Sequence, residues 1–427
     1  MNREIKNVAV LGASGTVGSL IGGLLAQYGL KVAFISRSTE RARRGLERAI
    51  AQARSEVIAK NIACGDYASL FQQAVPEADW IIEATTEDPE IKRQIYERVE
   101  VLRRPGAVIS STTSSLPLTL LAEGRDEDFR RHFLSTHFYN PPGRMLACEL
   151  TGHEDTDPEL VRFMGEYLRR ELHREVVPVK NAVAFAGNRI AFVLFSRITS
   201  LVERYGVELM DYLIGPYTGR LMPPLATLDL VGLDIHRAII HSLQTHTHDA
   251  MHDWLMLPPY LETMIQRGLL GRKRGAGFYK KLESGKYMFF DPDTCDYIPA
   301  IQPHVAFVEK AKHFIRMGKY HKAFETILEA EGKEAELVVS VLCTYIVYAY
   351  SLIGEVTPAE HGIAGIDTVM SAGFNWAPPS VVLEMLGGPA SVLRRCDAKG
   401  LPIPSCQESP KKTPLQILEA AKYFVAK

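Results

Sequence analysis

The residues best suited to chemistry in this chain are a histidine and a glutamate on neighbouring apolar segments. His137 lies within residues 135–141, which read STHFYNP, and Glu149 lies in the apolar segment that follows. A histidine at the end of an apolar strand, with one carboxylate on the next strand, suits general acid–base catalysis, because the carboxylate fixes the imidazole tautomer and stabilises the imidazolium that forms. Beside a nicotinamide site, such a pair would take the proton of an alcohol while the cofactor takes its hydride.

The pattern upstream of this pair predicts a parallel sheet that would position it. Residues 8–11 form a short apolar strand, followed by a Gly-rich turn, a helix at 19–28 and a strand at 31–35, which is the order of a βαβ unit. Further strands are predicted at 80–84, 107–111, 132–136 and 145–150. Between residues 36 and 80 we expect about one helix, at 40–58, and a turn at Cys64-Gly65-Asp66.

The Gly-rich turn between the first strand and the first helix is a candidate nucleotide site. Its residues are Gly12, Ala13, Ser14, Gly15, Thr16, Val17 and Gly18. Glycines there allow a tight turn and let backbone N–H groups approach a pyrophosphate at the helix N-terminus. The loop has one residue more than the GxGxxG fingerprint, but the βαβ spacing around it predicts a dinucleotide site.

The end of the second strand bears on which dinucleotide would bind. A carboxylate that would hold the ribose 2′-hydroxyl of NAD is missing there, and the chain has Ser36 and Arg37 instead. A missing acid together with an added guanidinium is how a 2′-phosphate is accommodated. We therefore expect NAD(P) as the cofactor, with NADP mildly favoured over NAD.

The chain becomes helical after residue 180. Residues 279–302 are polar and turn-rich, which indicates a hairpin or linker. Beyond them, Met222-Pro223-Pro224 recurs as Ala377-Pro378-Pro379, and each copy follows a helix of similar length. We predict a nucleotide-binding domain, a helical domain, a linker region and a second, degenerate copy of the helical domain, at 1–182, 183–281, 282–335 and 336–427.

Three further segments belong with these motifs: residues 112–115 after the fourth predicted strand, Gly187-Asn188-Arg189, and residues 271–279. Together they resemble the L-3-hydroxyacyl-CoA dehydrogenase family over nearly the whole chain. The doubled helical domain is similar to the dehydrogenase part of the large β-oxidation multifunctional enzymes, without their hydratase domain. The resemblance implies an α/β fold in which a Rossmann-type NAD(P)-binding domain is followed by two all-α helical domains. It also implies reversible oxidation of an L-3-hydroxyacyl-CoA in fatty acid metabolism.

The resemblance also assigns roles to individual residues. His137 would be the catalytic base and Glu149 its partner, while Ser114 would hydrogen-bond the substrate hydroxyl and Asn188 would bind a substrate oxygen. The positions on the nicotinamide side of the family's cofactor site correspond here to Glu87, Lys92, Asn140 and Lys273.

One departure from the family keeps two other functions open. Family members usually carry a long helical hairpin after the second strand that helps to hold coenzyme A, and residues 36–80 are too short for it. A dehydrogenase of a free or non-CoA β-hydroxy acid is therefore an alternative. A non-catalytic subunit of a fatty-acid oxidation complex is a third reading, which the complete set of four catalytic residues argues against.

Composition narrows the partners and the compartment. The chain has 49 Lys and Arg against 50 Asp and Glu, so we expect no nucleic acid partner. Six scattered cysteines, no apolar run approaching a membrane span and an apolar strand close to the start predict a cytoplasmic protein with no membrane contact and no signal peptide. We expect a monomer or homodimer, with association with a hydratase or thiolase as an option.

A cluster of histidines could suggest a metal site, but its spacing does not. The cluster comprises His236, His241, His246, His248 and His252, with His248 and His252 expected on one helix face. A zinc site needs three or four convergent ligands and groups that orient them, so we expect a solvated or partly buried helix face and no metal.

Overall fold

The computed structural model describes residues 4–114, 116–248, 250–403, 405–406, 409 and 412–426. The chain divides into two compact units. Unit 1 contains Met1–Phe185 together with Ala372–Phe374, and unit 2 contains Ala186–Ser371 and Asn375–Lys427. Each unit is described by itself below.

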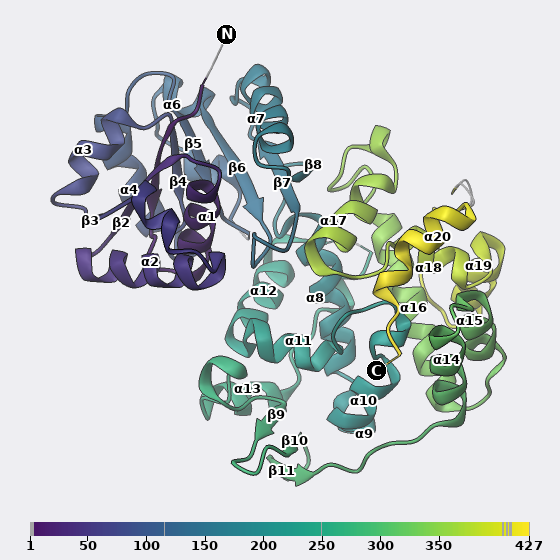
Figure 1. Ribbon diagram of the computed structural model, residues 1–427. Coiled ribbons are helices and arrows are strands. Elements are labelled where there is room, and N and C mark those ends of the chain that lie inside the picture. The colour runs from purple at the N-terminus through teal and green to yellow at the C-terminus, as the bar shows by residue number, and fades with distance from the viewer. Residues whose placement is uncertain are drawn as a thin grey trace. The chain divides into compact units, whose positions relative to one another are not determined.

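Unit 1 is built on an eight-stranded sheet with the strand order β3-β2-β1-β4-β5-β6-β7-β8. Figure 1 shows β6, β7 and β8 next to one another in this sheet. The strands are β1 (Asn7–Leu11), β2 (Lys31–Ser36), β3 (Ile62–Asp66), β4 (Trp80–Glu83), β5 (Val108–Ser111), β6 (Phe133–Phe138), β7 (Ala147–Gly152) and β8 (Glu175–Pro178). Neighbouring strands are parallel from β3 to β6, and β6 and β7 are antiparallel. The carboxyl ends of β1 to β6 therefore share one edge, where ligands bind in open α/β sheets.

Helices cover both faces of this sheet because successive strand residues point to opposite sides. Val8 and Val10 face a core formed with α1 (Thr16–Gln27), α2 (Thr39–Ala53) and α7 (Pro158–Arg170). Ala9 and Leu11 face a second core. That core is formed with α3 (Leu70–Glu77), α4 (Pro89–Leu102), α5 (Leu118–Ala122) and α6 (Glu127–Arg131). The sheet is therefore covered by an apolar core on each face.

The predicted strands and the first helix of unit 1 are confirmed, but two predictions between residues 36 and 80 are wrong. The stretch contains α3 as well as α2, and no turn is formed at residues 64–66. These residues form the end of β3, which pairs with β2 at the edge of the sheet. Gly and Asp are depleted in strands, so Gly65-Asp66 indicates a turn. An edge strand needs only one partner, and Gly65 lets α3 pack closely, since a Cβ there would lie 2.3 Å from Leu70 Cβ.

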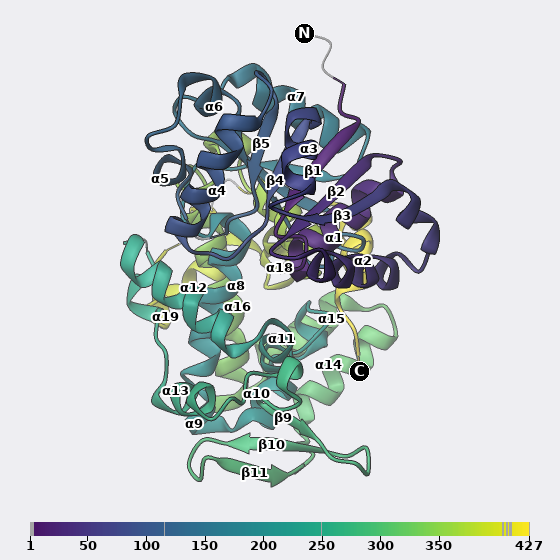
Figure 2. The same ribbon diagram turned by 90° about the vertical axis from the view of Figure 1, so that its left-hand side faces the viewer.

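Unit 2 is mainly helical, as expected, with a three-stranded antiparallel sheet that Figure 2 shows as neighbouring arrows. The first helices are α8 (Phe185–Thr199), α9 (Val202–Tyr205), α10 (Val207–Leu213), α11 (Pro224–Val231), α12 (Leu233–His246) and α13 (Pro259–Gln266). The strands are β9 (Tyr279–Lys281), β10 (Tyr287–Asp291) and β11 (Asp296–Pro299). The later helices are α14 (Ala306–Arg316), α15 (Tyr320–Glu329), α16 (Lys333–Ser351), α17 (Ala364–Phe374), α18 (Pro379–Met385), α19 (Gly388–Ala398) and α20 (Pro414–Ala420).

An aspartate holds each of the two Pro-Pro helix starts. Asp211 accepts the backbone N–H groups of Leu225 at 2.8 Å and Ala226 at 2.9 Å, in the first turn of α11. Asp367 accepts the backbone N–H of Ser380 at 3.1 Å, in the first turn of α18. The same device at both places supports the duplication, which stays a prediction together with the four domain boundaries. The predicted linker region itself contains β10, β11, α14 and α15.

One helix of unit 2 meets the length and composition of a membrane span, contrary to our expectation that no segment would. This helix is α16, and 78% of its most apolar window is buried within the structure. Burial of this kind is that of a core helix in a globular protein.

Candidate active site

The register of β6 and β7 brings His137 and Glu149 together. The two residues are direct partners across the antiparallel pair. His137 Nδ1 lies 2.7 Å from Glu149 Oε2, Glu149 is completely buried, and His137 is 7% exposed. With Nδ1 engaged by the carboxylate, Nε2 is the nitrogen positioned to exchange a proton with a substrate.

Two aromatic residues complete the surroundings of this pair. The Tyr139 hydroxyl donates to Glu149 Oε2 at 2.7 Å, the same oxygen that His137 contacts. The Phe185 ring lies 5.5 Å from the His137 ring, between centroids. Phe185 and the preceding Ala184 both have positive φ, 46° and 61°, a conformation that side chains rarely adopt. Such strain is typical of functional sites, where the surrounding structure enforces it.

The glycine-rich loop has the form needed to hold a dinucleotide. Gly12 has φ 85°, and a Cβ there would lie 2.5 Å from the Ala84 carbonyl oxygen, so only glycine fits. Gly15 caps α1 with no side-chain hydrogen bond, and Gly15, Thr16 and Val17 are exposed. Their position at a helix N-terminus, at the carboxyl end of β1, suits a pyrophosphate. The loop residues therefore fit the cofactor that the sequence predicts.

Helix α2 locks this loop in place. A Cβ at Gly45 would lie 2.0 Å from the Ala13 carbonyl oxygen, so the helix packs directly on the loop backbone. Arg48 of the same helix donates to the Ser14 carbonyl oxygen at 3.0 Å and to Ser19 Oγ at 3.2 Å. A preformed loop loses less conformational entropy when a ligand binds.

Ser36 and Arg37 lie where β2 ends, beside the loop. Ser36 is buried and Arg37 is exposed. Ser36 is paired with Asp66 at the end of β3. The Asp66 carboxylate accepts from Ser69 Oγ at 2.8 Å and from Ser69 N–H at 2.9 Å, and these bonds lower its pKa. The carboxylate of Asp66, the strand partner of Ser36, is thus already hydrogen-bonded to the turn that follows β3.

A buried polar network lies at the ends of β4 and β5, and it connects two predicted cofactor residues. Glu83, which is completely buried, lies 2.7 Å from Lys92 Nζ. It also accepts from Ser111 Oγ at 2.9 Å, from the Tyr96 hydroxyl at 3.0 Å and from Thr85 N–H at 2.7 Å. The Lys92 side chain is only 1% exposed, so this residue reaches the surface of the site through its second partner, Glu87, at 3.5 Å.

Glu87 in turn positions the segment that carries Ser114. Its Oε1 accepts from Thr113 Oγ1 at 2.6 Å and from the Ser114 backbone N–H at 2.9 Å. The structure therefore brings Glu87, Lys92 and Ser114 together. Ser115, in the same segment, lies outside the described residues.

The remaining predicted residues are placed separately. Asn140 is exposed just after β6. Asn188 is half-buried on α8, and Lys273 forms an ion pair with Asp234, both within unit 2. Their roles beside His137 stay predictions.

Sequence reasoning missed Glu83, Tyr139 and Arg48 as parts of the site. A glutamate at the end of an otherwise apolar strand was the available signal for Glu83, because a buried carboxylate requires partners. The aromatic residues around Tyr139 are typical of a core or a pocket wall, so no local pattern draws attention to its hydroxyl. Arg48 lies among the charged residues of α2, so no local pattern distinguishes it.

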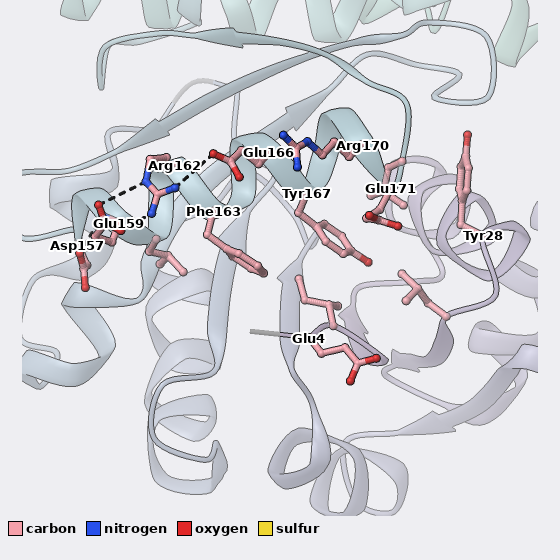
Figure 3. Close-up of a pocket in the computed structure, with 14 residues that line it drawn as sticks. Glu4, Tyr28, Asp157, Glu159, Arg162, Phe163, Glu166, Tyr167, Arg170 and Glu171 are labelled. Carbon is pink, nitrogen blue, oxygen red and sulfur yellow. Dashed lines mark hydrogen bonds and ion pairs between the residues drawn. The ribbon is translucent and has the colours of Figure 1, made fainter. Parts of the chain in front are cut away.

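One cavity in unit 1 lies away from these groups. It has a volume of about 690 Å³ and is lined mainly by α7 and by residues near the start of the chain, such as Glu4. Figure 3 shows Arg162 ion-paired with Glu159 and Glu166 along its wall. Ile5 and Leu30 precede β1 and β2, so the cavity lies at the amino ends of these strands, opposite to where ligands bind in such sheets.

The histidine cluster differs from the expected helix face. His236 is completely buried, stacks on Phe192 and has its pKa lowered to about 3 by burial. His248 lies beyond the end of α12 and contacts His252 with ring centroids 4.9 Å apart. Asp249, between them, lies outside the described residues, and within those described no group of three potential ligands could hold a metal ion.

Two family models match consecutive parts of the chain. Residues 7–182 match the model described as 3-hydroxyacyl-CoA dehydrogenase, NAD binding domain. Residues 185–281 match the model described as 3-hydroxyacyl-CoA dehydrogenase, C-terminal domain. The boundary between the two models falls just before α8.

Individual relatives carry similar names. A probable 3-hydroxyacyl-CoA dehydrogenase of Deinococcus radiodurans is 33% identical over 301 residues, which are 66% of this chain and 85% of the relative. One of Bacillus subtilis is 30% identical over 405 residues, 88% of this chain, and the chain spans only 50% of that relative's length. The crystal structure of 3-hydroxybutyryl-CoA dehydrogenase from Escherichia coli shares the fold, with a TM-score of 0.67 over 98% of both chains at 20% identity.

Proposed function

Because the chain belongs to the 3-hydroxyacyl-CoA dehydrogenase family, we propose that it catalyses the reversible, NAD(P)-dependent oxidation of an L-3-hydroxyacyl-CoA to the 3-oxoacyl-CoA. The observation that carries the proposal is the contact of His137 Nδ1 with the buried carboxylate of Glu149, at 2.7 Å. This pair follows a nucleotide loop in the same unit, on the same sheet.

His137 is the acid–base residue in this proposal. Neutral His137 carries its proton on Nδ1, directed to Glu149, and takes the proton of the substrate hydroxyl on Nε2. The positive charge that forms on the imidazole is then stabilised by the adjacent carboxylate. In the reverse direction, protonated His137 returns this proton to the oxygen at C3.

The cofactor would be held by the glycine-rich loop, with Gly15, Thr16 and Val17 at the pyrophosphate. A bound nicotinamide would supply the acceptor for the hydride that leaves C3 of the substrate. Glu87 would border the nicotinamide, while Lys92 would hold Glu87 in position from beneath. By family resemblance, Asn140 and Lys273 would also contact the cofactor.

Ser114 and Asn188 would orient the substrate. The Ser114 backbone is fixed by its bond to Glu87, which leaves the hydroxyl to bind the substrate oxygen. Asn188, at the start of α8, would bind a second substrate oxygen.

The direct test is the reduction of acetoacetyl-CoA with NADH and with NADPH, in which the loss of cofactor absorbance measures the rate. We expect turnover in the wild type and a loss of about 1,000-fold or more in kcat for His137→Ala, since general acid–base catalysis contributes about 100- to 10,000-fold. Full activity in this variant would overturn the mechanism.

We further propose that NADP is preferred, with Arg37 as the contact to the 2′-phosphate. Support comes from Ser36 at the usual acidic position and from the exposed Arg37 beside it. Arg37→Ala should lower kcat/KM for NADPH about 10-fold and leave NADH nearly unchanged, because a charge-assisted bond is lost only for the phosphate. Arg44→Ala is the matched control, because Arg44 and Glu40 form an ion pair within α2. This variant should keep the wild-type kcat/KM for both cofactors.

A second candidate substrate is a free or non-CoA β-hydroxy acid. The observation behind it is that α2 is the only α-helix between β2 and β3 in this fully described stretch, so a helical hairpin for coenzyme A is missing there. Rates with 3-hydroxybutyryl-CoA and with free 3-hydroxybutyrate distinguish the two substrates. Sedimentation at several concentrations tests the monomer or homodimer that we propose.

A further inference from the structure

Tyr139 contacts the acid–base pair with both its hydroxyl and its ring. Its hydroxyl donates to Glu149 Oε2 at 2.7 Å. His137 Nδ1 contacts the same oxygen at 2.7 Å, so a single carboxylate oxygen receives both donors. The Tyr139 and His137 rings also meet edge to face, with centroids 5.0 Å apart at 69°. The Tyr139 phenol and the His137 imidazole therefore contact each other, and both contact the Glu149 carboxylate.

The Tyr139 ring is itself held from a distant part of the sequence. Residues 372–374 cluster with unit 1, although the rest of α17 belongs to unit 2. The Phe374 ring lies 5.4 Å from the Tyr139 ring, and a Cβ at Gly373 would lie 3.0 Å from two Tyr139 ring atoms. Gly373 therefore lets the chain approach the ring closely, and the ring, 6% exposed, has little freedom to turn.

We propose that Tyr139 is a positioning residue for the acid–base pair, acting through Glu149. A completely buried carboxylate is costly unless hydrogen bonds support its charge, and the phenol supplies one in a fixed direction. Without the phenol, the carboxylate loses a donor that stabilises its charged form and the restraint that directs Oε2 to His137. The support for the imidazolium then weakens, which lowers kcat and leaves substrate and cofactor binding intact.

This inference rests on the proposed function, so its test includes variants that separate the two. Tyr139→Phe keeps the ring and removes only the hydroxyl. We expect about a 10-fold lower kcat with acetoacetyl-CoA, because a hydrogen bond to a charged group is lost, and KM within about 2-fold. Tyr260→Phe is the matched control, since its buried hydroxyl donates to the Thr199 carbonyl oxygen in unit 2, and its kcat should equal that of the wild type.

A double-substitution cycle then asks whether Tyr139 acts through Glu149. In the Glu149→Gln background, Tyr139→Phe should change kcat by less than about 2-fold, because the charge that the phenol supports is already gone. An equal loss in both backgrounds, or a Tyr139→Phe variant with wild-type kcat, would overturn the inference. If His137→Ala is fully active, the proposed function fails; if His137→Ala is inactive while Tyr139→Phe is unaffected, this inference alone fails.

Discussion

Two completely buried glutamates in unit 1 carry their charge in different surroundings. Glu149 accepts from the His137 imidazole and the Tyr139 phenol, whereas Glu83 is paired with the ammonium of Lys92 at 2.7 Å. A histidine can gain a positive charge during a reaction, while a lysine in an ion pair already carries one. The comparison teaches that burial alone does not mark a catalytic carboxylate; the partner does. We infer that Glu149 serves chemistry and that Glu83 holds the sheet edge and Lys92 together.

The largest effect should follow from breaking the Glu83 pair. Lys92→Met leaves Glu83 buried without its cation, and we expect the free energy of unfolding to fall by about 3–5 kcal/mol. Chemical denaturation of the full chain measures this loss. The double variant Glu83→Gln/Lys92→Met should recover most of it, because no buried charge remains. A Lys92→Met variant as stable as the wild type would contradict the structural role that we assign to Glu83.

The sequence alone predicts some features of unit 1 and not others. The strands β1, β2, β4 and β5 follow from short apolar runs, and the loop follows from glycine spacing. The places of His137 and Glu149 on consecutive apolar strands suggest that they pair, but local patterns do not fix the register that puts them directly opposite each other. The bonds of Glu83 and Tyr139 join residues on different elements, and no short-range pattern in a single sequence encodes such contacts.

A smaller effect is expected where the cofactor loop needs glycine. Gly12→Ala places a Cβ 2.5 Å from the Ala84 carbonyl oxygen, beside β4, which ends in Glu83. The loop must shift, and we expect NADH and NADPH affinity, measured by fluorescence titration, to fall about 10-fold, since backbone strain costs about 1–3 kcal/mol. Gly29→Ala is the matched control, with the same φ of 85° and nothing within 4 Å. Equal affinity losses in both variants would contradict the role of the close contact.

The smallest effect concerns two buried aspartates of unit 2, Asp211 and Asp229, to which we assign no catalytic role. Burial raises the pKa of Asp211 to about 7 and that of Asp229 to about 6. Aspartates in the unfolded chain have a pKa of about 3.9. Between that pH and the pKa of Asp211 in the folded chain, the folded state binds more protons than the unfolded state. The contribution of Asp211 to stability therefore declines as pH rises toward 7. Asp211→Asn should flatten this part of the dependence of Tm on pH. An unchanged slope between pH about 5 and 8 would show that Asp211 does not contribute.

The most direct test of the central claim is the kcat of Glu149→Gln, measured together with its Tm. We predict a loss of about 100-fold in kcat with acetoacetyl-CoA, because the imidazolium loses its charged partner, and a Tm loss smaller than that of Lys92→Met. A Glu149→Gln variant that keeps wild-type kcat, or one that loses stability as Lys92→Met does, would contradict the division between a chemical and a structural glutamate.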